Sequence, residues 1–342
     1  MTEYIRKESI ASLREILSRA RRCAVVSHTH PDGDALGSSA ALALYLKGLG
    51  KEVTVVLPDS VPEPLRFILP ESIPYLFGNR QKEAAGQCLR EVDTLILADA
   101  NGFSRAEGLE DALHASKACK VLMDHHLNPD NGSFDLVFST PEISSASELV
   151  FWILLALEEG RKLPVDIGAA LLTGMTTDTN NFANSVFPST LEMAAQLLAT
   201  GVNRDAILSN LYQQYRENRV RLMGYMQAEQ MRILPCGAAY MVLSRDIQRR
   251  FELLDGESEG LVNVPLSIGR VRLSVLLKED EGHFRVSVRS KAGTSAQQLA
   301  ARHFHGGGHE NAAGGKLFIG ADIPSPEAAP AFLEQILNAF LV

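Results

Sequence analysis

Residues 23–34, CAVVSHTHPDGD, decide the fold of the N-terminal half of this chain. The stretch begins with an apolar run at 23–26 and turns through a polar loop. It then enters a helical segment at 35–49 that is rich in alanine and leucine. Strand, turn and long helix in this order form the repeating unit of a parallel α/β sheet. The same strand signal recurs in three further apolar runs, 53–57, 94–98 and 121–123. We therefore predict an N-terminal, doubly wound and mainly parallel α/β sheet.

The rest of the chain indicates a second, smaller α/β domain. Residues 191–232 read as continuous helix, broken clearly only at Gly201-Val202-Asn203, and predict a helical linker. Beyond them, strand signals at 239–243, 271–277, 284–288 and 316–319 are joined by helical segments at 295–303 and 325–341. A chain of 342 residues fits two domains. The predicted boundaries are 1–190 for the first domain, 191–232 for the linker and 233–342 for the second domain.

Composition and charge exclude several classes of protein. No apolar run approaches the roughly 18–20 residues that a membrane span needs, and the charged N-terminal segment lacks the apolar core of a secretory signal. The four cysteines are scattered without a CxxC pair, which favours reduced thiols and a cytoplasmic protein. The net charge of -8 argues against a long duplex nucleic acid as partner, because such partners need a basic face. The sequence carries no signal for an oligomeric state.

The first chemical signal is the loop His28-Thr29-His30-Pro31-Asp32-Gly33-Asp34. It follows a predicted strand directly, where open α/β sheets place their ligands. Imidazole and carboxylate groups together suit a small divalent ion such as Mn²⁺, Mg²⁺ or Zn²⁺. The alternative is a purely structural loop, in which Asp34 caps the helix that starts at residue 35.

Ionisable residues also end the next strands of the predicted sheet. Asp99 follows the run at 94–98, Asp124-His125-His126 follows the run at 121–123, and Asp178 ends a later helical segment. A lone aspartate at such a place is often only a turn residue, but three strands ending in this way favour a shared site. Four clustered carboxylates repel one another in a partly buried site. Two divalent ions would neutralise them and would suit a two-metal hydrolase.

The second domain carries a candidate phosphate site. Arg289-Ser290 ends a predicted strand, and Gly306-Gly307-Gly308-His309 precedes a second glycine pair. Glycines let backbone N–H groups approach a phosphate, and arginine grips phosphate oxygens bidentately. Taken alone, the glycine run also fits a flexible loop.

These motifs in this order resemble the DHH/DHHA1 phosphoesterases, named after the triplet at 124–126. Within that group the chain is most similar to bacterial bifunctional enzymes that degrade short oligoribonucleotides and dephosphorylate 3′-phosphoadenosine 5′-phosphate (PAP). The resemblance covers nearly the whole chain and implies an active site in the cleft between the two domains. It assigns His28 and Asp32 to a first metal ion and Asp99 to both ions. The remaining roles it implies are metal ligands at Asp34, His125 and Asp178, a substrate-facing histidine at His126, and substrate binding by Arg289, Ser290, Gly306, Gly307, Gly308 and His309.

The resemblance also implies the cofactor and the substrate class. We expect two divalent ions, with Mn²⁺ ahead of Mg²⁺. The expected partners are short single-stranded RNA or DNA oligonucleotides, nanoRNA among them, or phosphonucleotides such as PAP. A phosphodiesterase for linear dinucleotides is the nearest alternative. A single-strand exonuclease, an inorganic pyrophosphatase and a non-catalytic nucleotide-binding regulator are further alternatives.

Overall fold

The structure, a computed structural model, describes residues 5–341, and these divide into two compact units, 5–214 and 215–341. The first four residues of the charged N-terminal segment lie outside the described residues. The division falls inside the stretch 191–232 that the sequence predicts as a linker, so its helices belong to different units. Across residues 5–341, each helix is too short or too polar to span a bilayer.

The first unit is built on a six-stranded parallel sheet with the strand order β3-β2-β1-β4-β5-β6. The predicted doubly wound parallel fold is therefore confirmed. The strands β3 and β6 were not predicted, because both are short and lie at the two edges of the sheet. The strands are β1 Arg22–Val26, β2 Glu52–Leu57, β3 Tyr75–Phe77, β4 Thr94–Ala98, β5 Cys119–Asp124 and β6 Leu136–Ser139.

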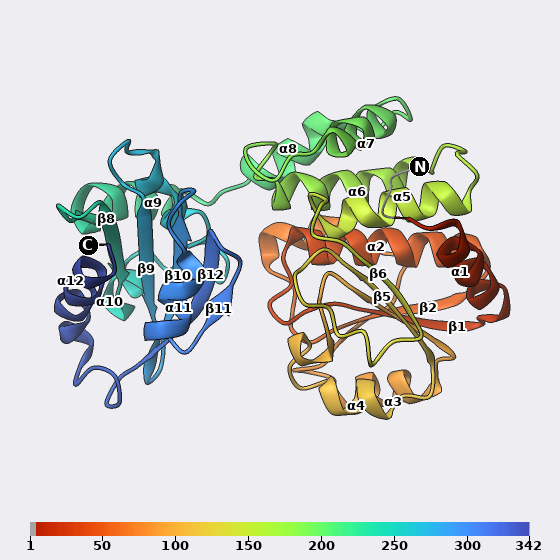
Figure 1. Cartoon of the computed structure of the whole chain (residues 1–342), viewed down its shortest axis with the longest axis horizontal. Helices are drawn as coiled ribbons and strands as arrows, with labels where there is room; N and C mark the ends of the chain where they lie inside the picture. The colour runs from red at the N-terminus through yellow and green to blue at the C-terminus, as the bar shows by residue number, and fades with distance from the viewer. Residues whose placement is uncertain (1–4, 342) are drawn as a thin grey trace. The chain divides into compact units, whose positions relative to one another are not determined.

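Helices cover both faces of this sheet (Figure 1). Alternate residues of each central strand serve opposite faces: Cys23 and Val25 enter one apolar core, and Ala24 and Val26 enter the other. The first face packs α1 Lys7–Arg19, α2 Gly33–Gly48, α5 Ala146–Leu157, α6 Val165–Asp178, α7 Pro188–Leu198 and α8 Arg204–Tyr212. The second face packs α3 Lys82–Glu91 and α4 Glu110–Ala115; the short 3₁₀ helices are η1 Glu63–Ile68 and η2 Phe103–Arg105.

Two glycines let α2, α5 and α6 approach one another closely. A Cβ atom added at Gly37 in α2 would lie 2.6 Å from the carbonyl oxygen of Ala170 in α6. A Cβ atom added at Gly174 in α6 would lie 2.0 Å from Ser147 Oγ and 2.9 Å from Asp34 Oδ1. This close packing brings the start of α2, the start of α5 and the end of α6 to one place.

The second unit is a six-stranded mixed sheet with the order β11-β12-β10-β9-β8-β7. Only β8 and β9 pair in parallel; the other neighbours are antiparallel. The strands are β7 Arg232–Ile233, β8 Ala238–Leu243, β9 Leu273–Glu279, β10 His283–Ser290, β11 Gly307–Gly308 and β12 Ala312–Phe318. The last strand starts four residues before the predicted 316, so much of the glycine-rich run is strand and not loop.

Two apolar cores flank this sheet. One core packs α11 Ala296–His303 and α12 Ala329–Phe340 against it. The other packs α9 Glu217–Tyr225, the π-helical turn Met226–Gln230 and the 3₁₀ helix η4 Leu261–Ser267. The helix α10 Arg245–Arg250 and the 3₁₀ turn η5 Pro326–Ala328 complete the unit. Both units are thus sheets covered by helices, as a mixed α/β architecture requires.

Candidate metal centre

The predicted metal-binding side chains of the first unit meet at the carboxyl edge of its sheet. His28, Asp99 and His125 follow the ends of β1, β4 and β5, which are neighbours in the sheet. The start of α2 adds Asp34, and the end of α6 adds Asp178. These residues therefore lie together as the sequence predicts, because neighbouring parallel strands have their carboxyl ends at the same edge of the sheet.

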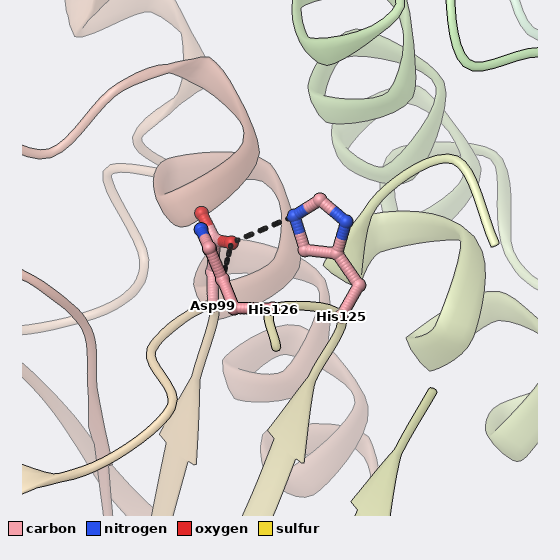
Figure 2. A group of neighbouring side chains, drawn as sticks. All are labelled: Asp99, His125 and His126. Carbon is pink, nitrogen blue, oxygen red and sulfur yellow. Dashed lines mark ion pairs between the residues drawn. The ribbon is translucent and has the colours of Figure 1, made fainter. Parts of the chain in front are cut away.

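The side chains form overlapping groups, and Asp99 belongs to two of the three. Asp99 Oδ2 lies 3.4 Å from His28 Nε2, and Asp99 Oδ1 lies 3.4 Å from His125 Nε2. Each oxygen of one carboxylate thus faces a different histidine. Figure 2 shows His125 and His126 both directed at Asp99.

Further carboxylates lie close to His28 and His125. His28 Nε2 lies 3.9 Å from Asp32 Oδ1. His125 Nε2 lies 4.0 Å from Asp34 Oδ2 and 3.6 Å from Asp178 Oδ2. The candidate ligands fall into three groups: His28-Asp32-Asp99, Asp34-His125-Asp178, and Asp99-His125-His126.

The separations fit shared metal ions. Two ligand atoms about 2.1 Å from one ion lie about 3.0 Å apart at a right angle and at most about 4.2 Å apart. The measured separations of 3.4 to 4.0 Å between the histidine nitrogens and carboxylate oxygens fall in this interval. Oxygen and imidazole donors are also the ligands that Mn²⁺ accepts.

Neighbouring backbone groups orient the ligands. His28 Nδ1 lies 2.8 Å from the carbonyl oxygen of Thr29, which can only accept, so Nδ1 carries the proton and Nε2 is directed at the carboxylates. Asp34 accepts the N–H groups of Ala146 (2.6 Å) and Ser147 (2.9 Å) at the start of α5. These two hydrogen bonds fix the position and orientation of the Asp34 carboxyl group at the start of α5.

Asp32 serves two purposes. Its Oδ1 accepts the N–H groups of Asp34 (3.0 Å) and Ala35 (3.1 Å), so Asp32 is the N-cap of α2. The alternative reading, in which Asp34 capped this helix, is therefore wrong. The cap fixes the loop so that the Asp32 carboxylate stays beside His28.

Asp99 has two features of a functional residue. Its φ angle is +58°, in the left-handed region that side-chain-bearing residues rarely adopt. Its side chain is only 3% exposed, and among the described residues Oδ1 accepts no hydrogen bond. A buried oxygen without a hydrogen bond is costly, and strained residues gather at functional sites. A metal ion at this place would satisfy the oxygen.

The electrostatics of the cluster show that it lacks positive charge. Burial, and then the charge of Asp99, raise the pKa of Asp34 to about 7. Burial and the charge of Asp34 raise the pKa of Asp178 to about 8. These two carboxyl groups resist ionisation because they are buried among other carboxylates.

The histidines respond in the opposite direction. Burial lowers the pKa of His28, but Asp99 and Asp32 outweigh it and raise the pKa to about 9. Burial likewise lowers the pKa of His125, and Asp99 with Asp178 raises it to about 10. Burial raises the pKa of Asp99, yet the two histidines beside its carboxylate hold the pKa below its usual value. Protons on these groups offset part of the negative charge of the carboxylates, and bound divalent cations would offset it instead.

Asp124, the first residue of the triplet, orients the third. Its fully buried carboxylate accepts the backbone N–H of His126 at 3.0 Å and the Nδ1–H of the same residue at 2.7 Å. His126 Nδ1 also lies 3.8 Å from Asp99 Oδ1. This role of Asp124 was not predicted, although the place of Asp124 in the triplet was a signal. The two hydrogen bonds from the start of α5 to Asp34 were also not predicted, because backbone N–H donors cannot be recognised from residue type.

His30, which the sequence analysis leaves without a role, lies on the same loop but points elsewhere. Its backbone N–H donates to Asp59 Oδ2 at 2.9 Å, and its side chain is 70% exposed. It belongs to none of the three potential metal-binding groups among the described residues.

In the second unit, Arg289 lies beside the glycine-rich strands. Arg289 pairs with Ala312 across β10 and β12, and its Nη1 donates to the carbonyl oxygen of Val288 at 2.9 Å. Gly308 pairs with Ala313 across β11 and β12. Burial lowers the pKa of Arg289. The strand that carries Arg289 and the glycine strand β11 thus lie on either side of β12.

The three glycines at 306–308 differ in backbone conformation and in the space that a side chain would have. A Cβ atom at Gly306 would lie 1.9 Å from the carbonyl oxygen of Gly314, and Gly308 has a φ angle of +142°. A Cβ atom at Gly307 would meet nothing within 4 Å. Gly306 and Gly308 are thus required for the backbone to fold, whereas Gly307 leaves open space beside the exposed His309.

Ser290 holds the loop that follows Arg289. Its hydroxyl donates to the carbonyl oxygen of Thr294 at 2.6 Å and accepts from Asn311 Nδ2 at 3.0 Å. The side chain is therefore engaged in tying 291–294 to the start of β12. Asn311 was not predicted, and it is the residue that joins the two glycine-rich segments to this loop.

Comparisons with known proteins agree with this arrangement. Residues 22–175 match the DHH family, N-terminal domain, and residues 239–341 match the DHHA1 domain. The bifunctional oligoribonuclease and PAP phosphatase NrnA of Thermus thermophilus is 31% identical over 86% of this chain and 83% of its own length. The Bacillus subtilis protein of the same name is 27% identical over 85% of this chain and 88% of its length.

A solved structure is similar over both units. The exopolyphosphatase-related protein of Bacteroides fragilis is 34% identical, with a TM-score of 0.93, and the match covers 100% of this chain and 98% of that one. The match over nearly the full length of both chains shows that the two proteins share the fold of both units.

Proposed function

The chain belongs to the DHH/DHHA1 family of phosphoesterases, and from that premise we propose that it is a two-metal enzyme that hydrolyses short oligoribonucleotides and PAP. The observation that carries the proposal is Asp99, whose two oxygens lie 3.4 Å from histidines of two different ligand sets. A bridging carboxylate of this kind is what a pair of closely spaced ions needs. Mn²⁺ is the proposed ion, and the cytoplasm is the proposed location.

Each proposed ligand has a defined task. His28 and Asp32 would hold one ion, and His125 and Asp178 would hold the other. Asp34, which the start of α5 keeps in place, would join the second set, and Asp99 would contribute to both. The ions would neutralise the clustered carboxylates, activate a water molecule and stabilise the charge that develops on the phosphoryl group.

The remaining residues act on the substrate. His126 is proposed to contact the substrate phosphate, since Asp124 fixes the orientation of its ring. Arg289, Gly307 and His309 are proposed to bind a terminal phosphate or the adjoining nucleotide. Ser290, Gly306 and Gly308 keep that region in shape. This assignment predicts that Arg289 affects substrate binding and that the carboxylates affect turnover.

A short substrate follows from charge and composition. A long strand gains affinity from a basic groove with stacking aromatic side chains. This chain has a net charge of -8 and 6% aromatic residues, and its single tryptophan, Trp152, is buried in α5. We therefore propose substrates of a few nucleotides.

The test is a panel of substrates with and without Mn²⁺. RNA two-mers, five-mers and 24-mers, PAP, linear dinucleotides, polyphosphate and pyrophosphate should be compared by kcat/KM. The proposal expects Mn²⁺-dependent cleavage with the two-mer far above the 24-mer. Preference for the 24-mer, or cleavage of pyrophosphate alone, would contradict it.

A further inference from the structure

Arg204 of the first unit is held against the turn that follows Asp178, one of the proposed metal ligands. Arg204 is the only lysine or arginine between Lys162 and Arg216. It is the first residue of α8, and its Nη2 donates to Asn181 Oδ1 at 2.6 Å. Among the described residues, no carboxylate lies within ion-pair distance of it.

Several other arginines of this unit are paired with carboxylates. Arg14, Arg22 and Arg161 each form an ion pair with a glutamate. Those pairs cancel the charge of the guanidinium. A neutral carboxamide, as at Asn181, fixes Arg204 in place and leaves its charge available to an anion.

An aromatic ring supports the same guanidinium. The Cζ atom of Arg204 lies 5.7 Å from the centre of the Phe182 ring, within range of a cation–π contact. Phe182 itself packs against the main core of the unit. One arginine N–H group is engaged by Asn181, and the planar fork still presents others for bidentate binding of phosphate.

The supporting turn is strained and follows a proposed metal ligand. Asn180, Asn181 and Phe182 have φ angles of +46°, +57° and +66°. The turn is closed by the buried Thr179, whose Oγ1 accepts the N–H of Phe182 at 3.0 Å. Asn181 is three residues beyond Asp178, so its Cα lies within about 11 Å of the Asp178 Cα. Consecutive left-handed residues persist only where the surrounding structure enforces them, and they mark functional sites.

We propose that Asn181, Phe182 and Arg204 form a phosphate subsite beside the Asp178 end of the metal cluster. This subsite binds the phosphate of a nucleotide next to the one that is cleaved. The inference rests on the proposed function, because it assumes that the metal cluster acts on a phosphodiester. It adds a second anchoring point, on the metal-bearing unit itself, to the one proposed at Arg289.

The test combines equilibrium binding with kinetics on the full chain. Binding of an RNA three-mer is measured in Ca²⁺, and hydrolysis is measured in Mn²⁺ for the three-mer and for bis(p-nitrophenyl) phosphate, a minimal diester. The variants are Arg204→Ala, Arg204→Lys and Asn181→Gly; glycine tolerates the positive φ angle. The control is Arg161→Ala, which removes the same charge beyond the far end of α5, about 18 Å along a 12-residue helix.

We expect Arg204→Ala to weaken binding of the three-mer and to raise its KM at least about tenfold, or about 1.4 kcal/mol. The slope of log affinity against log salt should fall by about 0.7, the value for one phosphate contact on a single strand. The loss on the three-mer should exceed the loss on the minimal diester at least about tenfold. Arg204→Lys and Asn181→Gly should show smaller losses in the same direction, and Arg161→Ala should match the wild type.

Two results would overturn the subsite. One is wild-type binding and KM for Arg204→Ala with the three-mer. The other is an equal loss on both substrates, which would mean that Arg204 acts only through the Asp178 loop. If the wild type hydrolyses neither substrate with Mn²⁺, the proposed function fails, and the binding arm still decides whether Arg204 holds a phosphate.

Discussion

Replacing Asp99 by asparagine should remove catalysis while leaving the fold intact. Asparagine keeps the shape of the side chain and tolerates the left-handed backbone, where the φ angle is +58°. It removes one negative charge and one of the two oxygens that face His28 and His125. The substitution therefore isolates the proposed bridging role.

The expected loss follows from Coulomb's law. A unit charge pair about 4 Å apart is worth about 4 kcal/mol at an effective dielectric constant of 20. We take this value as the stabilisation that Asp99 gives to the charge developing in the transition state. If the amide oxygen of asparagine still supplies a third of it, the activation barrier rises by about 2.7 kcal/mol. That corresponds to a hundredfold fall in kcat. Asp99→Ala should lose at least as much, and it should also lower Tm because alanine disfavours the left-handed region.

The assay measures kcat on an RNA two-mer at saturating Mn²⁺, together with Tm and bound manganese per chain. Asp93→Asn is the matched control. Asp93 lies at the opposite end of β4, where its Oδ2 accepts the N–H groups of Arg21 and Arg22. That variant should lose stability and keep its kcat. An Asp99→Asn enzyme with more than about a tenth of the wild-type rate would refute the reasoning.

Further predictions concern the rest of the site. Asp124→Asn should lower kcat without loss of manganese, because it weakens the acceptor that orients His126; unchanged kcat would count against that role. Gly174→Ala should lower Tm and manganese affinity together, since its Cβ would lie 2.0 Å from Ser147 Oγ; a manganese titration by calorimetry would show whether only Tm changes. Arg289→Ala should raise KM for the two-mer more than it lowers kcat, and the reverse pattern would place Arg289 in the chemical step. Exhaustive chelation should abolish hydrolysis and added Mn²⁺ should restore it, whereas activity that survives chelation would exclude the metal centre.

The central strands of the first sheet could be predicted from the sequence, because they are apolar runs that end in ionisable residues. His28, Asp99 and His125 could be grouped on that basis, since parallel neighbours share an edge. The edge strands β3 and β6 could not be predicted, because three or four half-buried residues carry no clear alternation. β12 was placed too late because its glycines read as a loop, although pairing with β10 and β11 makes them strand.

The contacts that orient the ligands were beyond sequence reasoning. The N–H groups of Ala146 and Ser147 reach Asp34 across more than a hundred residues, and backbone donors are present at nearly every position. The left-handed φ angle of Asp99 is likewise a property of the packed sheet edge. Residue type points to the candidate ligands, and packing decides how their side chains are held.

Anomalous diffraction from crystals of the manganese-loaded protein tests the two-metal claim most directly. We predict two manganese peaks about 3.5–4 Å apart, with one oxygen of Asp99 on each. His28 and Asp32 should lie on one ion and His125 and Asp178 on the other. A single peak, or two peaks that Asp99 does not join, would contradict it.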